Sequence, residues 1–166
     1  MRKKAVPIVF ILVIMIQAGA AKVEPAGPAE AAEDPRIVSS LAEAAPDPQK
    51  PLVLVFFSLD CHVCWEELFE MRYFIQEYSI PIDLIGVTMD KNDDLEPFLR
   101  KYSFFHPVVS DRQRELYRRF QVRLEPATVI LENGRVLYRE SPVEDYSNRK
   151  EKVRKCLLEI AARSRF

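Results

Sequence analysis

Hydrophobic residues first form a short continuous run between two structure breakers. Leu52 to Phe57 is unbroken, rich in residues that favour β-strands, and bounded by Pro51 and Ser58. Such a run indicates a strand that is covered on both faces. Apolar residues then recur every three or four positions from Cys64 to Tyr78. This spacing predicts one helix that begins close to Cys61.

A second strand and a second helix follow in the same order. Ile82 to Met89 is again apolar, and an apolar stripe runs through the next helix at Leu95, Phe98, Leu99 and Tyr102. Because a helix connects the two strands, we expect them to lie parallel in one sheet.

The rest of the chain predicts an antiparallel sheet edge and a closing helix. Arg112 to Phe120 reads as a short charged helix, and Ala127 to Leu131 as a third strand. Asn133-Gly134 then turns the chain into Arg135 to Arg139, since Asn-Gly accepts the positive φ angles of a two-residue hairpin. Apolar positions from Val153 to Ala161 mark a final helix. The pattern predicts an α/β fold with a mixed four-stranded sheet and helices on both faces.

The N-terminal region differs from this pattern. Residues 1–21 begin with basic residues, continue with an apolar run and end with small residues. This order is typical of an export signal. The run is about 17 residues long, at the lower limit for a membrane span, so a signal peptide and an N-terminal membrane anchor both stay open. We expect the rest to be exported, to the periplasm or another extracytoplasmic space, free or anchored to the inner membrane.

Composition then sets the domain boundaries. Residues 22–36 are rich in Ala, Pro and Glu and predict a linker. Residues 37–166 predict one domain, in which residues 37–45 could form one short helix. Basic and acidic residues nearly balance, 24 against 25, so the charge gives no sign of a nucleic-acid surface. We expect no nucleic-acid partner.

The candidate chemistry lies in Cys61-His62-Val63-Cys64, between the first predicted strand and helix. At a helix start, unpaired backbone N–H groups and the helix dipole stabilise a thiolate, and the two-residue spacing lets the second sulfur close a disulfide. We expect Cys61 to attack a substrate disulfide and Cys64 to resolve the mixed disulfide. The expected substrates are protein thiols and disulfides, and no cofactor is expected.

Other interpretations of the motif stay open. A zinc site needs four ligands, and only Cys156, His62 and His106 remain to complete one. A structural disulfide in a non-catalytic binding module is compatible with an oxidising compartment, although so small a loop constrains the unfolded chain little. Ser58, three residues before the first cysteine, fits a peroxidase of the peroxiredoxin kind, but Leu54 stands where that motif has Pro.

Several motifs between Leu52 and Tyr138 fit one known family. They are the cysteine motif, the Asp90 turn after the second strand, Pro107-Val108-Val109-Ser110-Asp111, and Glu125-Pro126-Ala127-Thr128 with Asn133-Gly134 beyond it. On these motifs the chain resembles thioredoxin-like proteins, and among them the TlpA/ResA type of membrane-anchored, periplasmic thiol-disulfide oxidoreductase.

The resemblance implies a role for Pro126 and a direction of electron flow. In that family the corresponding proline is cis and faces the cysteines, where it blocks metal binding and presents backbone to a substrate strand. Proteins of this type keep selected cysteines reduced. The resemblance therefore implies a protein-disulfide reductase that a membrane electron donor re-reduces, whereas an oxidase would use the same sulfurs at a different potential.

The resemblance also directs attention to an acid near the motif. The buried acid that thioredoxin carries six residues before its first cysteine falls on Val55 here. Another group must then take the proton of Cys64, and Glu125, just before the expected cis proline, is the candidate. A solvated loop glutamate is the alternative interpretation of Glu125.

Substrate contacts are expected from Pro126, His62 and Trp65. His62 lies between the cysteines, and as a cation it would stabilise the first thiolate. The family usually has Trp immediately before the first cysteine, whereas this chain has Asp60 there and its single Trp, Trp65, after the second cysteine. A negative charge at Asp60 opposes thiolate formation.

Overall fold

The structure of the protein is a computed structural model that describes residues 34–141, 143 and 145–164. The expected signal or anchor, residues 1–21, and the expected linker up to residue 33 lie outside these residues. None of the described helices is both long and apolar enough to cross a membrane.

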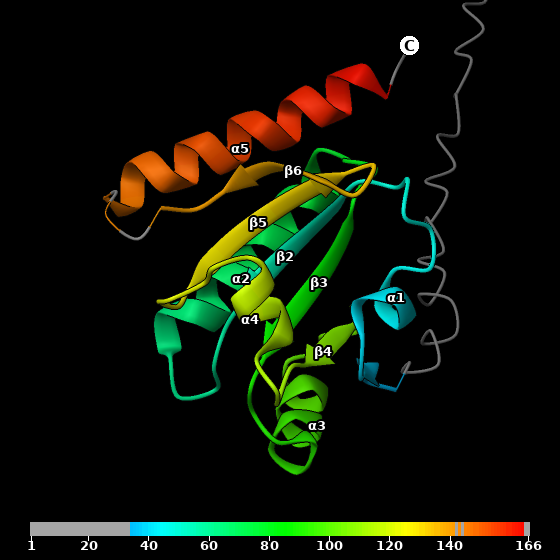
Figure 1. Ribbon diagram of the computed structural model, residues 1–166, viewed down its shortest axis with the longest axis vertical. Helices are drawn as coiled ribbons and strands as arrows, with labels where there is room; N and C mark the ends of the chain where they lie inside the picture. Colours follow the sequence, from blue (N-terminus) through cyan, green and yellow to red (C-terminus); the bar gives the residue numbers. More distant parts are fainter. Residues whose placement is uncertain (1–33, 142, 144, 165–166) are drawn as a thin grey trace, which may run out of the picture. The chain divides into compact units, whose positions relative to one another are not determined.

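The centre of the fold is one mixed sheet (Figure 1). Its strands are β1 (Ile37–Val38), β2 (Leu52–Phe56), β3 (Asp83–Thr88), β4 (Val108–Ser110), β5 (Ala127–Glu132) and β6 (Arg135–Arg139), in the spatial order β1-β4-β3-β2-β5-β6. The pairs β1/β4, β4/β3 and β3/β2 are parallel, whereas β5 pairs antiparallel with β2 and with β6. The parallel β2/β3 pair and the antiparallel hairpin confirm the predicted topology.

The prediction of four strands is wrong, because the described sheet has six. The additional strands, β1 and β4, are too short to show a periodic pattern. The helix expected over residues 37–45 is also wrong. Its first residues pair with β4, and the amide of Val108 donates to the carbonyl of Arg36 (2.9 Å). Ser40 then caps a shorter helix, α1 (Leu41–Ala44), by accepting a hydrogen bond from the amide of Glu43.

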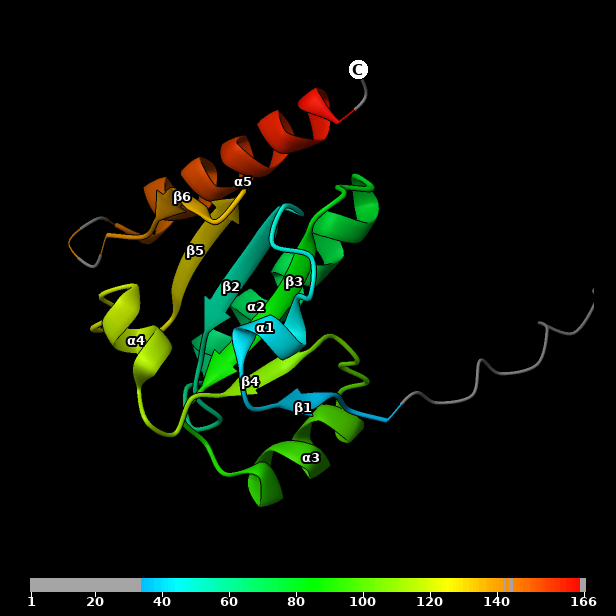
Figure 2. The ribbon, with the colours of Figure 1, turned by 45° about the vertical axis from the view of Figure 1, so that its right-hand side comes forward.

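The described helices lie on the two faces of the sheet (Figure 2). One face packs against α2 (His62–Glu77), α3 (Asn92–Lys101) and α5 (Tyr146–Arg163), and the other against α1 and α4 (Glu115–Arg119). The helices expected after β2 and β3, the short charged helix and the C-terminal helix are all present, as predicted.

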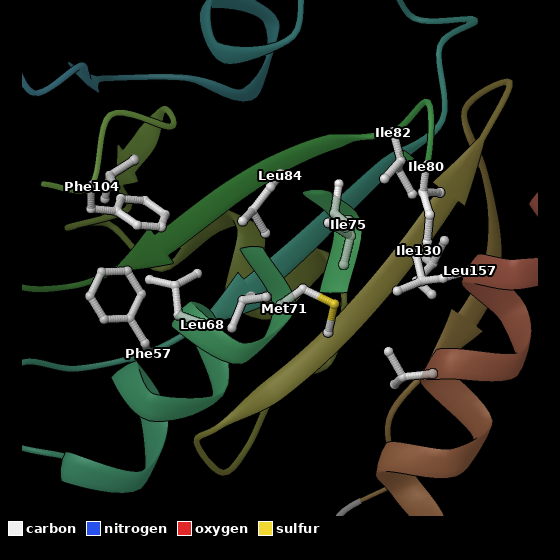
Figure 3. Packing of buried hydrophobic residues seen from close by; sticks show 14 of the residues in the cluster. Phe57, Leu68, Met71, Ile75, Ile80, Ile82, Leu84, Phe104, Ile130 and Leu157 are labelled. Carbon is white, nitrogen blue, oxygen red and sulfur yellow. The ribbon is translucent and has the colours of Figure 1, made fainter. Parts of the chain in front are cut away.

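Alternating residues of β2 supply both cores. Val53 and Val55 contribute to the cluster under α2, α3 and α5, whereas Leu54 and Phe56 contribute to the cluster under α1 and α4, and all four are fully buried. Figure 3 shows the first cluster, where helix and strand side chains interdigitate. Each such side chain contributes about 1.5–3 kcal/mol on burial. The continuous apolar run therefore marks a strand covered on both faces, as predicted.

A buried carboxylate fixes the start of α4. Asp111 accepts hydrogen bonds from the amides of Glu115 (2.8 Å), Leu116 (2.9 Å) and Tyr117 (3.1 Å). These amides have no partner within the helix, so the carboxylate satisfies donors that would otherwise be buried without an acceptor. The position of α4 relative to the end of β4 therefore depends on Asp111.

Asp111→Ala is expected to lower the free energy of unfolding by about 2 kcal/mol, because three backbone N–H groups lose their acceptor. Asp145→Ala is the matched control: Asp145 caps α5 but accepts from one backbone amide, so its loss is expected to cost about 1 kcal/mol. Urea unfolding of both variants measures the difference. Equal losses would contradict the special role of Asp111.

Candidate active site

Cys61 and Cys64 form a disulfide at the start of α2, with their Cα atoms 5.3 Å apart. Cys61 is the N-cap residue, and its carbonyl accepts from the amides of Cys64 (3.0 Å) and Trp65 (3.4 Å). Cys64 is fully buried, whereas Cys61 is partly exposed. The difference in exposure favours Cys61 as the sulfur that a substrate reaches.

The turn that precedes Cys61 is tied to the end of β3 by Asp90. The Asp90 carboxylate accepts from the amide of Leu59 (2.8 Å) and from the hydroxyl of Thr88 (2.7 Å), and Thr88 is fully buried. The amide of Cys61 donates to the carbonyl of Ser58 (3.1 Å), which closes the turn. Asp90, one of the residues that carry the family resemblance, thus positions the loop that holds the cysteines.

A groove beside Cys61 contains Glu125. The groove is lined by Cys61, Met89, Arg114, Tyr117, Arg123, Leu124 and Glu125. The hydroxyl of Tyr117 donates to the Glu125 carboxylate. Burial, reinforced by this hydrogen bond, raises the pKa of Tyr117 far above its ordinary value, so the phenol stays protonated and acts as a donor. Glu125 and Cys61 therefore line the same groove, whereas Cys64 does not line it.

Pro126 lies at the edge of the sheet from which the cysteine loop leaves. Ala127, the first residue of β5, pairs with Phe56, the last residue of β2. The Glu125–Pro126 peptide bond is cis, which confirms the conformation that the resemblance implies. A contact between Pro126 and a substrate strand stays a prediction.

His62 and Trp65 lie on the other side of the motif, toward α3. The His62 ring is 4.4 Å from the Trp65 ring, and its Nδ1 atom is 3.3 Å from the Glu66 carboxylate. Trp65 also packs against Phe98 (6.0 Å) and Tyr102 (5.3 Å), measured between ring centroids. Trp65 therefore joins α2 to α3. Substrate binding by His62 and Trp65 stays a prediction.

The residues left over for a zinc site do not complete one. In the part of the chain that the structure describes, no three His, Cys, Asp or Glu side chains lie close enough together to hold a metal ion. His106 lies beside Phe104, with ring centroids 5.3 Å apart, and burial lowers its pKa. Cys156 has no disulfide partner and packs at the edge of the core under α5.

A buried acid that the sequence analysis missed lies one helical turn after Cys64. Glu67 is 5% exposed and shares the inner face of α2 with Leu68 and Met71. One carboxylate oxygen accepts from the Thr128 hydroxyl (3.3 Å), and the other has no hydrogen-bond partner among the described residues. Burial raises the pKa of Glu67. Its position beside the apolar stripe, three residues after the second cysteine, is the one sequence signal for it, and the same signal fits a Glu turned to solvent.

A second buried acid meets the first at Thr128. The Glu140 carboxylate accepts from the backbone amide of Thr128 (2.6 Å) and forms an ion pair with Arg149. Burial, and next the charge of Glu67, raise the pKa of Glu140 to about 7. Thr128 lies opposite Val55 in the sheet, so this network lies beside the position at which thioredoxin has its buried acid.

Comparison with known proteins agrees with this architecture. The AhpC/TSA family matches residues 31–139. The thiol-disulfide oxidoreductase YkuV of Bacillus subtilis (strain 168) is 26% identical over 90 residues, which cover 51% of this chain and 61% of the relative. The chain thus spans about three fifths of the length of this relative.

Solved structures share the fold. An uncharacterised thioredoxin-like protein from Porphyromonas gingivalis superimposes with a TM-score of 0.56 at 20% identity, over 70% of this chain and 78% of that one. StoA from Bacillus subtilis gives a TM-score of 0.52 at 21% identity, over 66% and 84%. The fold is therefore thioredoxin-like, as the motifs predicted, and the chain belongs to the AhpC/TSA family.

Proposed function

We propose that the protein is an exported thiol-disulfide oxidoreductase that acts on protein thiols and disulfides through Cys61 and Cys64. The observation that carries the proposal is the arrangement of the pair: a partly exposed sulfur at a helix N-terminus with a buried sulfur one turn behind it. The first position favours a reactive thiolate, and the second favours a resolving thiol. The name of the relative YkuV supports the same activity.

In the reducing direction, two exchanges transfer two electrons to the substrate. The Cys61 thiolate attacks the substrate disulfide, forms a mixed disulfide and releases one substrate thiolate. Cys64 loses its proton and attacks the sulfur of Cys61, which restores the Cys61–Cys64 disulfide and releases the second substrate thiolate. Unpaired N–H groups at the start of α2 stabilise the Cys61 thiolate before it attacks the substrate disulfide.

The proton of Cys64 needs an acceptor in a buried place. Glu125 was the expected acceptor, but it lines the groove on the Cys61 side, where the Tyr117 hydroxyl binds it. Glu67 shares the inner face of α2 with Cys64 and has a free carboxylate oxygen. Its raised pKa makes it a stronger base than an exposed glutamate. We favour Glu67 as the acceptor for Cys64 and Glu125 as a polar group of the substrate groove.

The direction of electron flow and the location are part of the same proposal. Support for a reductase re-reduced by a membrane electron donor comes from the resemblance to the TlpA/ResA type. Support for an extracytoplasmic location comes from residues 1–21, which read as a signal or an anchor.

Cys64→Ser is expected to trap a mixed disulfide on Cys61, because the resolving sulfur is absent. The measurement is the mass of the adduct formed with a disulfide-bonded protein, before and after dithiothreitol. Cys61→Ser is the control and is expected to form no adduct. A structural disulfide in a binding module would trap nothing, and peroxide consumption by the unmodified protein would instead indicate a peroxidase.

Glu67→Gln is expected to slow the attack of Cys64 on Cys61 by about tenfold to a hundredfold at neutral pH, because the base is lost. In the unmodified protein this rate rises as the pH passes the raised pKa of Glu67, since only the ionised carboxylate accepts a proton. The variant loses that rise. Stopped-flow fluorescence of Trp65, the single Trp, follows the step. If Glu125→Gln removes the rise and Glu67→Gln does not, Glu125 is the acceptor.

The reduction potential of the Cys61–Cys64 pair is expected to lie near that of thioredoxin, about −270 mV, if the protein is a reductase. Equilibration of the purified protein against thiol–disulfide mixtures measures it. A value near −120 mV, as for a strong periplasmic oxidant, would reverse the proposed direction.

A further inference from the structure

Positive charge exceeds negative charge in two short segments of the folded domain, residues 112–123 and residues 149–155. Residues 112–123 contain five arginines and one acidic residue, Glu115, whereas the whole chain has a net charge of −1. This segment comprises α4 and most of the connection to the cis proline. The local excess of charge in residues 112–123 therefore lies on the elements that border the cysteines.

Three of these arginines extend from Cys61 along the surface. Arg114 and Arg123 line the same groove as Cys61. Arg118 joins them in the lining of the neighbouring groove, and the two grooves share Tyr117 as a common wall. All three arginines are exposed. We name this surface, formed by Arg114, Arg118 and Arg123, the arginine groove.

The guanidinium groups of the arginine groove lack acidic partners among the described residues. Arg118 donates to the carbonyl of Gln113, and no side-chain partner is found for Arg114 or Arg123 within the described part of the chain. Three arginines outside the groove, by contrast, form ion pairs: Arg100 with Glu96, Arg149 with Glu140, and Arg163 with Glu132.

Two carboxylates near Tyr117 accept hydrogen bonds from groups other than these arginines. Glu125 accepts the hydrogen bond of Tyr117, and Asp111 accepts three backbone amides of α4. Neither carboxylate therefore binds an arginine of the groove. A planar guanidinium without a partner is suited to bind a carboxylate through two parallel hydrogen bonds.

We propose that the arginine groove binds an acidic segment of the partner protein, adjacent to the cysteine that reacts with Cys61. The inference rests on the proposed function and adds to it a class of substrate: protein disulfides flanked by Asp or Glu. Charge complementarity in an exposed groove acts mainly on the rate of encounter and weakens as salt screens it. The groove thus selects substrates by the charge of the residues that flank the disulfide.

The test uses three peptides that contain the same disulfide and differ only in the flanking residues, which are Asp, Ser or Lys. The reduced full-length protein is mixed with each peptide, and the second-order rate of reduction is measured at 20 mM and 500 mM salt. The acidic peptide is expected to react about tenfold faster than the neutral one at low salt, and about equally fast at high salt. The basic peptide is expected to react more slowly than the neutral one at low salt.

A charge-reversal variant locates the effect. In Arg114→Glu/Arg123→Glu the ratio of the acidic to the neutral rate is expected to fall below one. This ratio, taken within one variant, is independent of any change in the reactivity of Cys61 itself. Arg135→Glu/Arg154→Glu changes the net charge equally at positions outside both grooves, and is expected to keep the preference for the acidic peptide.

The outcomes separate the two proposals. If the neutral peptide is reduced but the acidic one has no advantage at low salt, the arginine groove proposal is overturned and the oxidoreductase stands. An equal loss of the preference in Arg135→Glu/Arg154→Glu would also overturn it, because net charge alone would then explain the effect. If no peptide is reduced, both proposals fail.

Discussion

Burial of β2 on both faces determines where the cysteines can lie. Val53 and Val55 fill one core, Leu54 and Phe56 fill the other, and close packing on both sides leaves the strand little freedom to shift. The chain therefore leaves β2 at a fixed place, beside the end of its parallel neighbour β3. Because β5 runs antiparallel and begins opposite Phe56, the cis proline must lie at the same sheet edge as the cysteine loop. The pairing of β2 brings together parts of the site that lie more than 60 residues apart.

Sequence periodicity predicted the strands and helices whose apolar side chains form the core. The run at β2 and the stripe of α2 are visible because every buried position is apolar. β1 and β4 were not predicted because two or three residues cannot show a period. Their strand conformation depends on pairing with residues far away in the chain, β1 with β4, and β4 with β3. Glu67 escaped because a single Glu on an apolar helix stripe looks the same whether it is buried or turned to solvent. Only the packing of α2 against β5, where Thr128 meets it, distinguishes the two cases.

The two buried carboxylates, Glu67 and Glu140, both interact with the charge of the partly buried Arg149. Glu140 is ion-paired with Arg149, whereas the Thr128 hydroxyl is the one hydrogen-bond donor to Glu67 among the described residues. If both acids were ionised, a net negative charge would remain in a region of low dielectric, which is costly. The raised pKa values of both acids follow from this arrangement, and Glu140, at about 7, titrates in the physiological range. Since Glu67 and Glu140 repel each other when charged, a proton that binds to one of them lowers the basicity of the other, and the pair titrates as a unit.

The surroundings of the disulfide differ on its two sides. Toward α3, His62 and Trp65 continue into a cluster of aromatic rings that holds α2 in place. Toward α4, the wall is polar. Glu125 binds Tyr117 there, and Arg114 and Arg123 line the same groove without an acidic partner among the described residues. The aromatic side can hold the cysteine turn in position, but it cannot distinguish substrates by their charge. The exposed polar side can distinguish substrates by their charge, and its side chains do not contribute to the core. Because Asp111 anchors α4 to the sheet through backbone amides alone, the exposed side chains of α4 can change without loss of the helix position. Under the two proposals, the fold separates the residues that carry out the exchange from those that select the substrate.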